Sequence, residues 1–192
     1  MRFLLTIITV VSLLFVSPAF SAWHLDDSKS SLTFVSIKKG SIAENHRFKT
    51  FSAELNKKGL LSVAIDLGSV DTRIPIRDSR MTEFLFETAK FSQANFTAQI
   101  NINELDNIAV GTSKRLSVSG NIDLHGQQQA IVIDVLVAKL ANNSMLVTTV
   151  QPVIIKAKDF SLVAGINKLQ ALAKLPSIAY TVPVSFVLTF QK

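Results

Sequence analysis

The chain contains no cysteine, and this absence excludes several classes of exported and metal-binding protein. Without thiols there is no disulfide framework, no thiolate metal cluster, no cysteine nucleophile and no cysteine-anchored lipoprotein. Charged residues make up only 18% of the 192 positions, against 48% hydrophobic residues, so the chain is too apolar to be disordered. Its length is that of one domain of ordinary size, in which a core forms without covalent cross-links.

Aromatic residues with a polar edge are scarce as well, since one tryptophan and one tyrosine stand beside 13 phenylalanines. Lys and Arg number 20 against 14 Asp and Glu, which gives a formal net charge of +6. A surplus of this size can attract anionic head groups and is compatible with transient contact with a membrane surface. The sequence has no long basic run and no basic-aromatic ribbon, so we expect no nucleic-acid partner.

Residue patterns for catalysis or metal binding are also missing. The histidines His24, His46 and His125 form no metal-ligand spacing with one another or with a carboxylate. No serine stands in a Gly-x-Ser-x-Gly pattern, and His125 precedes a glycine as a turn residue does. We therefore predict no catalytic residue, no metal site and no cofactor. A constellation that only the fold assembles stays open, and with it a lipid-modifying hydrolase or isomerase.

The beginning of the chain has the pattern of a cleaved export signal. Arg2 precedes an apolar run over residues 3–16, and a Ser-Pro breaker is followed by the small residues Ala19 and Ser21. Small residues at these two positions are typical of a signal-peptidase site, which places the cut after Ser21. An uncleaved membrane anchor is the alternative, but the run is shorter than the ~20 residues that a span needs.

The predicted organisation is therefore a signal peptide over residues 1–21 and a single domain over residues 22–192. Export without disulfides favours the bacterial periplasm over a eukaryotic secretory route. We see no internal repeat, no low-complexity linker and no shift in composition that would divide the second segment.

Alternation of apolar and polar residues dominates the domain. In segment 95–102, for example, Phe96, Ala98, Ile100 and Ile102 share one face, and polar residues take the other. Such alternation predicts antiparallel strands with one apolar and one polar face. Further strands are predicted over residues 32–38, 48–55, 61–67, 115–124, 130–140, 145–157 and 180–190.

Two stretches depart from this alternation and predict short helices. Segment 76–89 places Met81, Phe84 and Leu85 at helical spacing, and segment 165–175 shows the same spacing before a proline. About eight strands is the number at which a closed barrel can hold one small ligand. The sequence thus predicts an all-β fold, an antiparallel barrel of about eight strands with two short helices.

Several separated motifs stand in a characteristic order. The first group is Ser69-Val70-Asp71-Thr72, then Arg77-Asp78, then the spaced aromatics Phe86, Phe91 and Phe96. The second is Leu124-His125-Gly126. In order and spacing these motifs resemble the signature of the YceI-like family of exported bacterial proteins, over residues 23 to about 137.

This resemblance implies a lipocalin-like barrel with a long apolar tunnel. The tunnel would hold an extended isoprenoid chain, such as a polyprenyl or quinone-type lipid, with its polar end near the mouth. The predicted function is an exported, non-catalytic carrier or sequestering protein for such an amphiphile. A small outer-membrane barrel is the alternative from a different class. The oligomeric state stays open.

Inward-facing phenylalanines are the predicted lining of the tunnel. Phe96, Phe186 and Phe190 lie on the apolar faces of clearly alternating strands. Phe51, Phe84 and Phe86 complete the candidate set. The alternative for each ring is an ordinary core position, because a filled barrel uses the same residue types.

Arg77 and Arg80 are the candidate contacts for the polar end of the lipid. They stand at the start of a predicted helix, where a guanidinium can donate a forked pair of hydrogen bonds to a phosphate or quinone oxygen. Unpaired N–H groups at a helix start also favour anions. The alternative is structural, with Arg77 and Asp78 paired so that they cap the helix and tie it to the Asp71-Thr72 turn.

The export prediction is tested by N-terminal sequencing of protein released from the periplasm by osmotic shock. The first residue should be Ala22 or Trp23, because the small residues Ala19 and Ser21 fit the two recognition positions before the cut. Protein in that fraction that still begins with Met1 would contradict the prediction.

Overall fold

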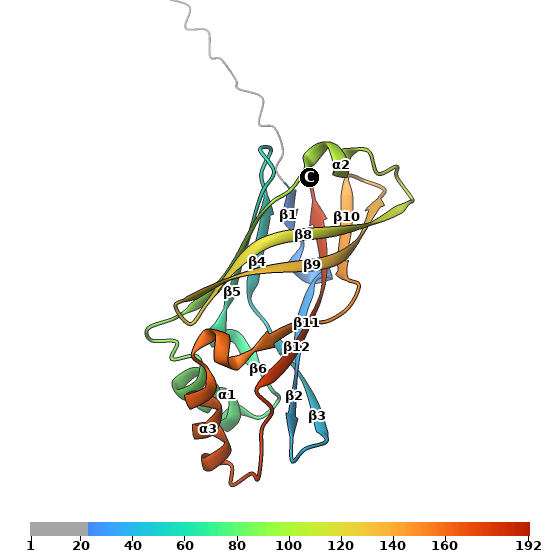
Figure 1. Cartoon of the computed structure of the whole chain (residues 1–192). Helices are drawn as coiled ribbons and strands as arrows, with labels where there is room; N and C mark the ends of the chain where they lie inside the picture. The colour runs from blue at the N-terminus through green and yellow to red at the C-terminus, as the bar shows by residue number, and fades with distance from the viewer. Residues whose placement is uncertain (1–22) are drawn as a thin grey trace, which may run out of the picture.

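The computed structural model describes residues 23–192, and the predicted signal peptide lies outside them. Its strands form one antiparallel sheet that closes into a barrel (Figure 1). Closure is made by β1 (Trp23–Leu25), which pairs with β4 (Phe51–Leu55) on one side and with β12 (Thr181–Gln191) on the other. The other strands of the ring are β5 (Leu60–Asp66), β7 (Gln93–Gln99), β8 (Ser113–Leu124), β9 (Gln127–Leu140) and β10 (Ser144–Thr149). The predicted all-β barrel of about eight antiparallel strands is confirmed.

The long strand β12 divides its pairing between two parts of the sheet. Its C-terminal half pairs with β1 and β10, and its N-terminal half pairs with β2 (Ser31–Lys38) and β11 (Val153–Lys156). Beyond β2 the sheet continues into β3 (Ile42–Phe48) and the short β6 (Val70–Asp71). The barrel is thus a closed ring at one end, called the ring end below, and at the other end, called the flared end, β2, β3, β6 and β11 extend the sheet.

Helices cover the flared end (Figure 1). Here α1 (Pro75–Arg80) runs directly into the π-helical turn η3 (Met81–Leu85), which packs against α3 (Val163–Leu172). The short helix α2 (Ile102–Asp106) lies at the ring end. Single 3₁₀ turns are η1 (Asp27–Lys29), η2 (Leu67–Ser69) and η4 (Ala157–Phe160). Within residues 23–192, no helix is both long enough and apolar enough to span a membrane.

The two predicted helices exist with shifted bounds, and a third was not predicted. Segment 76–89 forms α1 and η3, and segment 165–175 forms most of α3, which begins at Val163. The prediction that Ile102 continues a strand was wrong. The Asn101 side chain accepts a hydrogen bond from the Asn103 backbone N–H at 3.1 Å, which caps α2 and ends the alternation.

Two predicted strands were too long, and three strands were missed: β1, β3 and the two-residue β6. Segment 48–55 is divided, because Phe48 ends β3 and β4 begins only at Phe51. Segment 145–157 is divided at residues 150–152, which include a proline that cannot donate to a ladder. Strand β3 was missed because charged and polar residues interrupt its apolar face.

The turn between β8 and β9 shows how local sequence sets the register of the longest hairpin. His125 and Gly126 have φ values of 55° and 72°, which match the twist of a two-residue hairpin. A Cβ on Gly126 would lie 2.9 Å from the ring of Phe91, so the turn also needs a residue without a side chain. The pairing then runs from Leu124 with Gln127 to Ser113 with Ala138.

Close packing of α3 on η3 depends on Gly165. A Cβ at this position would lie 2.6 Å from the carbonyl oxygen of Phe84 and 2.8 Å from Cα of Leu85, both backbone atoms that cannot rotate away. We expect Gly165→Ala to lower the free energy of unfolding by about 1–3 kcal/mol through this overlap. The measurement is urea unfolding.

The control is Ala164→Gly at the exposed neighbouring position of α3. It reports the intrinsic helix preference alone, about 1 kcal/mol in favour of alanine. A stabilising Gly165→Ala substitution would mean that the two helices separate easily at this contact.

Candidate functional site

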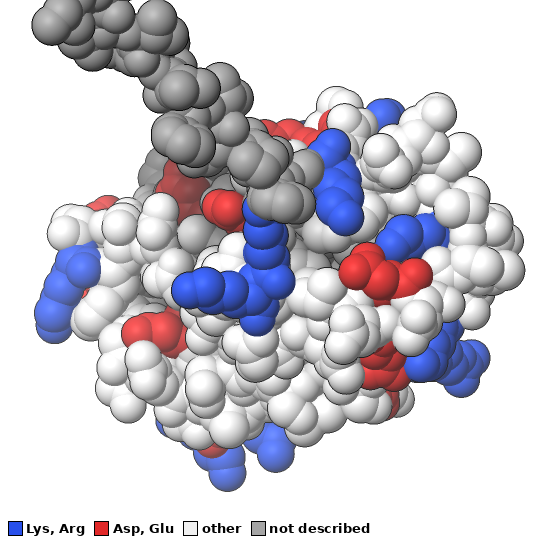
Figure 2. All heavy atoms as spheres, turned by 90° about the horizontal axis from the view of Figure 1, so that it is seen from above, with Lys and Arg blue, Asp and Glu red and all other residues white. Residues whose placement is uncertain are grey.

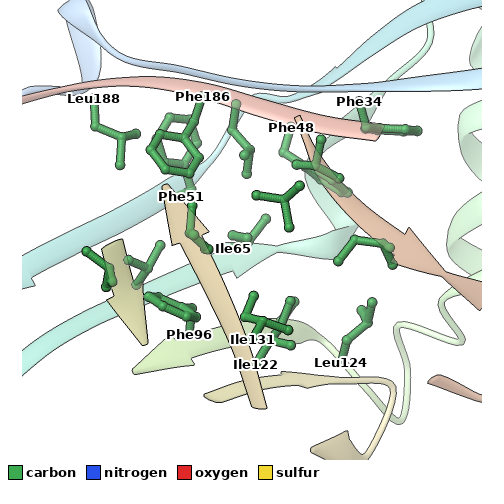
Figure 3. Close-up of a pocket in the computed structure, with 18 of the residues that line it drawn as sticks. Phe34, Phe48, Phe51, Ile65, Phe96, Ile122, Leu124, Ile131, Phe186 and Leu188 are labelled. Atoms are coloured by element: carbon green, nitrogen blue, oxygen red, sulfur yellow. The ribbon is translucent and has the colours of Figure 1, made fainter. Parts of the chain in front are cut away.

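The inner faces of the strands enclose an apolar cavity with a volume of about 250 Å³. It is lined at the ring end by Leu105 of α2 and at the flared end by Met81 of η3 and Ile166 of α3, so it runs the length of the barrel. Every lining residue is a phenylalanine, leucine, isoleucine, valine, methionine or alanine. Figure 3 shows side chains from opposite walls that point into this common space.

The size of the cavity separates it from a packing defect. A single water needs about 10–15 Å³ measured in this way, so a volume of about 250 Å³ is more than ten times larger. At about 24 cal/mol per Å³, leaving 250 Å³ unfilled costs the folded chain about 6 kcal/mol. This cost is comparable with the whole stability of a typical domain, which distinguishes the cavity from an ordinary packing defect.

Five of the six predicted aromatic residues line this cavity: Phe51, Phe86, Phe96, Phe186 and Phe190. The rings of Phe51, Phe96 and Phe186 come from three different strands and face the same space (Figure 3). Phe96 lies over Gly120 of β8, where a Cβ would come within 2.5 Å of the ring. The absence of a side chain at Gly120 therefore gives the Phe96 ring its position in the wall.

Phe84, the sixth predicted aromatic residue, is not among the residues of the described chain that line the cavity. On η3, Met81 and Leu85 face the cavity, and Phe84 is half-buried on another side. The ammonium of Lys168 on α3 lies 5.3 Å from the centre of the Phe84 ring. Helical spacing had grouped Phe84 with Met81 and Leu85, but the π-helical turn gives the inner face to only two of them.

The predicted arginines lie at the flared end, outside the apolar lining. Nη1 of Arg77 donates to Oε2 of Glu44 at 2.7 Å, and Nη2 donates to the carbonyl oxygen of Thr72 at 3.0 Å. Arg80 reaches the carbonyl oxygen of Leu172, at the C-terminal end of α3, at 3.5 Å. Arg80 thus connects the two helices that cover this end.

The alternative structural prediction for Arg77 and Asp78 was right about the turn and wrong about the pair and the cap, since α1 begins without a side-chain cap. Oδ1 of Asp78 accepts hydrogen bonds from the backbone N–H of Thr72 at 2.8 Å and from its hydroxyl at 2.5 Å. Arg77 pairs with Glu44 of β3 instead of Asp78. Both side chains therefore hold Thr72, one at its carbonyl oxygen and one at its N–H.

A set of polar side chains continues the inner face of β2 and β3 beyond the last aromatic lining residues. We call Ser36, Lys38, Glu44, His46 and Arg77 the polar cluster. Glu44 accepts from Lys38 at 2.8 Å and from Arg77 at 2.7 Å, while Ser36 and His46 are hydrogen-bonded at 2.8 Å. No sequence motif groups these residues. The available signal was the alternation of Ile42, Glu44, His46 and Phe48 on one face of β3.

The ionisation of the cluster follows from its contacts. The hydrogen bond from Lys38, followed by that from Arg77, lowers the pKa of the Glu44 carboxyl, so this group is ionised. Burial, with the positive charge of Arg77 as the next cause, lowers the pKa of His46. His46 is only 3% exposed and is neutral at pH 7.

The ring end also carries charged side chains: Nζ of Lys139 lies 3.8 Å from Oδ1 of Asp106, and the ammonium groups of Lys139 and Lys192 lie 5.1 and 5.5 Å from the centre of the Trp23 ring. Seen from the ring end, basic and acidic side chains of the described residues are interspersed on a largely uncharged surface (Figure 2). Lys114 and Glu104 form an exposed pair there at 2.8 Å, of a kind that contributes little to stability. Across residues 23–192, no group of three or more His, Asp or Glu side chains is arranged to hold a metal ion.

The closed antiparallel barrel and its ligand-sized apolar lumen define a binding protein of the lipocalin-like class. A family model described as the YceI-like domain matches residues 23–190, and the chain belongs to this family. The comparison with curated proteins gives no match.

Solved structures support the same assignment. A polyisoprenoid binding domain from Saccharophagus degradans, described as implicated in plant cell wall breakdown, is 40% identical, with a TM-score of 0.86 over 88% of this chain and 97% of that chain. BcnA from Burkholderia cenocepacia is 20% identical, with a TM-score of 0.67 over 86% and 98% of the two chains. The YceI protein of Campylobacter jejuni is 18% identical, with a TM-score of 0.50 over 73% and 82%. The last two similarities concern the fold alone.

The buried, neutral state of His46 gives the stability of the protein a defined dependence on pH. Its pKa in the folded protein lies below the ordinary value of 6.5, so just below pH 6.5 the unfolded chain binds a proton that the folded chain does not. The free energy of unfolding should therefore fall as the pH drops from about 7.5 to about 5.5, by at most about 1.4 kcal/mol per pH unit for this one group.

Denaturant unfolding of the protein and of His46→Phe at these two pH values measures this contribution. The variant should lose less stability over the interval, because it lacks the titrating ring. Glu44 and Asp71, whose pKa values are lowered, lose their stabilising effect only at more acidic pH and do not interfere. Equal losses in both proteins would show that His46 titrates normally.

Proposed function

We propose that the protein is exported to the periplasm and there carries or sequesters an isoprenoid-type amphiphile, without catalysing a reaction. The ligand would be a polyprenyl or quinone-like lipid whose tail lies in the lumen. Contact with a membrane surface would be transient, during loading and release.

The observation that carries this proposal is the uniformly apolar, elongated lumen. Such walls offer a lipid tail burial but no directional hydrogen bonds, so they select by length and shape. Each buried CH₂ group contributes about 0.8 kcal/mol, and a tail of about ten buried carbons contributes about 8 kcal/mol before the costs of association. The 40% identical domain from Saccharophagus degradans, itself described as polyisoprenoid binding, supports the choice of tail.

The flared end is the proposed place for the polar end of the lipid. The polar cluster follows the apolar lining there, whereas the lining at the ring end closes with Leu105 of α2. An amphiphile would thus lie with its tail toward α2 and its polar end toward α1.

The direction of the strand alternation disfavours the outer-membrane alternative. On β8, Leu116 and Val118 line the lumen, and Ser117 and Asn121 alternate with inward positions on the outer face. A membrane barrel has the opposite arrangement, with apolar residues outward and polar residues inward. For the enzymatic alternative, no polar side chain of the described residues lines the apolar lumen, so a reacting group would have to come from the polar cluster at the flared end.

Filling the lumen should reduce lipid binding without unfolding the barrel. Val118 lines the cavity, so Val118→Phe places a ring where tail carbons would lie. Displacing about two tail carbons costs about 1.6 kcal/mol of binding, which is more than ten-fold in affinity. The apo protein should be at least as stable as before, because the ring fills empty volume.

The matched control is Val132→Phe on the neighbouring strand, where Val132 faces outward and is 65% exposed. This variant should bind an all-trans polyprenol as tightly as the unchanged protein does. Native mass spectrometry and competition with a fluorescent fatty acid measure the binding. If Val118→Phe binds the polyprenol as well as the control does, the lumen is not where the tail lies.

A further inference from the structure

A row of aromatic rings leads from the lumen into the polar cluster. The ring centres of Phe86 and Phe48 lie 5.8 Å apart, those of Phe48 and Phe34 5.3 Å, and those of Phe34 and His46 5.2 Å. The three phenylalanines line the cavity, and His46 does not. His46 pairs directly with Phe34 across β2 and β3, and Phe48 follows two residues along on the same face. The row of apolar rings therefore ends at a polar ring, the imidazole of His46.

Two buried polar atoms at this point have no hydrogen-bond partner within residues 23–192. They are Nδ1 of His46 and Nε of Arg77. The rest of each side chain is held, His46 through Nε2 by Ser36 at 2.8 Å and Arg77 by Glu44 and Thr72. Buried polar atoms are nearly always paired, and leaving one unpaired opposes folding. Because these two atoms lie where the apolar lining ends, an oxygen atom on a bound amphiphile is a suitable hydrogen-bond partner for both.

The charged groups around these atoms already have partners, including Arg73, whose positive charge also acts on His46 and whose guanidinium donates to the carbonyl oxygen of Asn45 at 3.3 Å. Glu44 lies between Lys38 and Arg77 and accepts from both, and the Asp78 carboxylate, in the first turn of α1, accepts from Thr72. A phosphate placed there would meet two carboxylates and would have to leave water beside a histidine that is 3% exposed. An uncharged oxygen meets neither obstacle, because it needs only hydrogen bonds.

We infer that Ser36, His46 and Arg77 form a subsite for an uncharged oxygen at the polar end of the lipid, a hydroxyl or a carbonyl. This inference rests on the proposed function and adds a specificity to it. The tail would occupy the lumen, and the terminal oxygen would lie beside Nδ1 of His46 and Nε of Arg77. Ionised head groups would be discriminated against.

Both tautomers of His46 fit this chemistry. If Ser36 donates to Nε2, Nδ1 carries a proton, and a carbonyl oxygen can accept from both Nδ1 and the Arg77 Nε–H. If Nε2 donates to Ser36, Nδ1 is an acceptor, and a hydroxyl can donate to it while accepting from Arg77. The direction of the hydrogen bond between Ser36 and His46 thus determines whether the site prefers a carbonyl or a hydroxyl group.

The test uses the full mature chain and four probes with the same isoprenoid tail: an alcohol, a quinone, a monophosphate and the hydrocarbon without oxygen. The unchanged protein should bind the alcohol or the quinone at least about ten-fold more tightly than the hydrocarbon, which is about 1.4 kcal/mol. It should bind the monophosphate less tightly than the better of the two neutral probes. Equal affinity for the hydrocarbon and both neutral probes, or preference for the monophosphate, would overturn the inference.

Variants then assign the effect to residues. His46→Phe keeps a ring beside Phe34 and removes both nitrogens, so it should abolish the preference for an oxygen while leaving hydrocarbon binding unchanged. Arg77→Lys keeps the charge that faces Glu44 and removes the Nε–H donor, so it should reduce the same preference. It provides the test if His46→Phe fails to fold. If neither variant changes the preference, the oxygen binds elsewhere.

The matched control is His125→Asn, at a second buried histidine whose Nδ1 also has no partner in the described chain. His125 lies in the β8–β9 turn with a φ of 55°, a conformation that asparagine tolerates, and it does not line the cavity. This variant should keep the oxygen preference. Failure of all four probes to bind would contradict the proposed function itself, whereas binding without an oxygen preference contradicts only the subsite.

Discussion

Pairing of the first strand with the last is the constraint on which the rest of the structure depends. Two residue pairs between β1 and β12, His24 with Gln191 and Leu25 with Phe190, join the ends of the sheet into a ring. Once the ring is closed, the two-residue period of each strand directs every second side chain inward. The apolar residues at those positions then enclose a space that they do not fill, and a lumen results.

The strand alternation made most of the lumen predictable from sequence. Phe96, Phe186 and Phe190 lie on inward faces because polar residues alternate with apolar ones along their strands. A one-residue shift in register would turn all three rings outward. The prediction failed where the period changed. Phe84 shares a π-helical turn with residues that face the lumen, and the difference between α- and π-helical spacing is not visible in the sequence.

The polar cluster was not predictable in the same way. His46 stands among charged residues on a short strand, and its neighbour Arg77 is 31 positions away on a helix that packs there only in the folded chain. The same holds for Arg77 and Glu44, whose pairing replaced the expected contact with the adjacent Asp78. Local sequence suggests partners that are near in the chain, whereas this cluster depends on how the flared end closes.

The two ends of the barrel have different structural roles. At the ring end, eight strands and α2 enclose the lumen with backbone pairing, which is directional and rigid. At the flared end, the covering comes from helices that touch through side chains and through the close approach at Gly165. The helical covering of the lumen and the polar cluster therefore lie at the same end of the barrel.

Ring closure between β1 and β12 also determines when the lumen comes into existence. The partners His24 and Gln191 lie at the two ends of the domain, so the chain can pair all intermediate hairpins and still be an open, curved sheet. Closing so long a loop carries a high entropic cost and is typical of slowly folding β proteins. The cavity is thus a property of the complete domain, and a growing chain has no binding site until its final strand is in place.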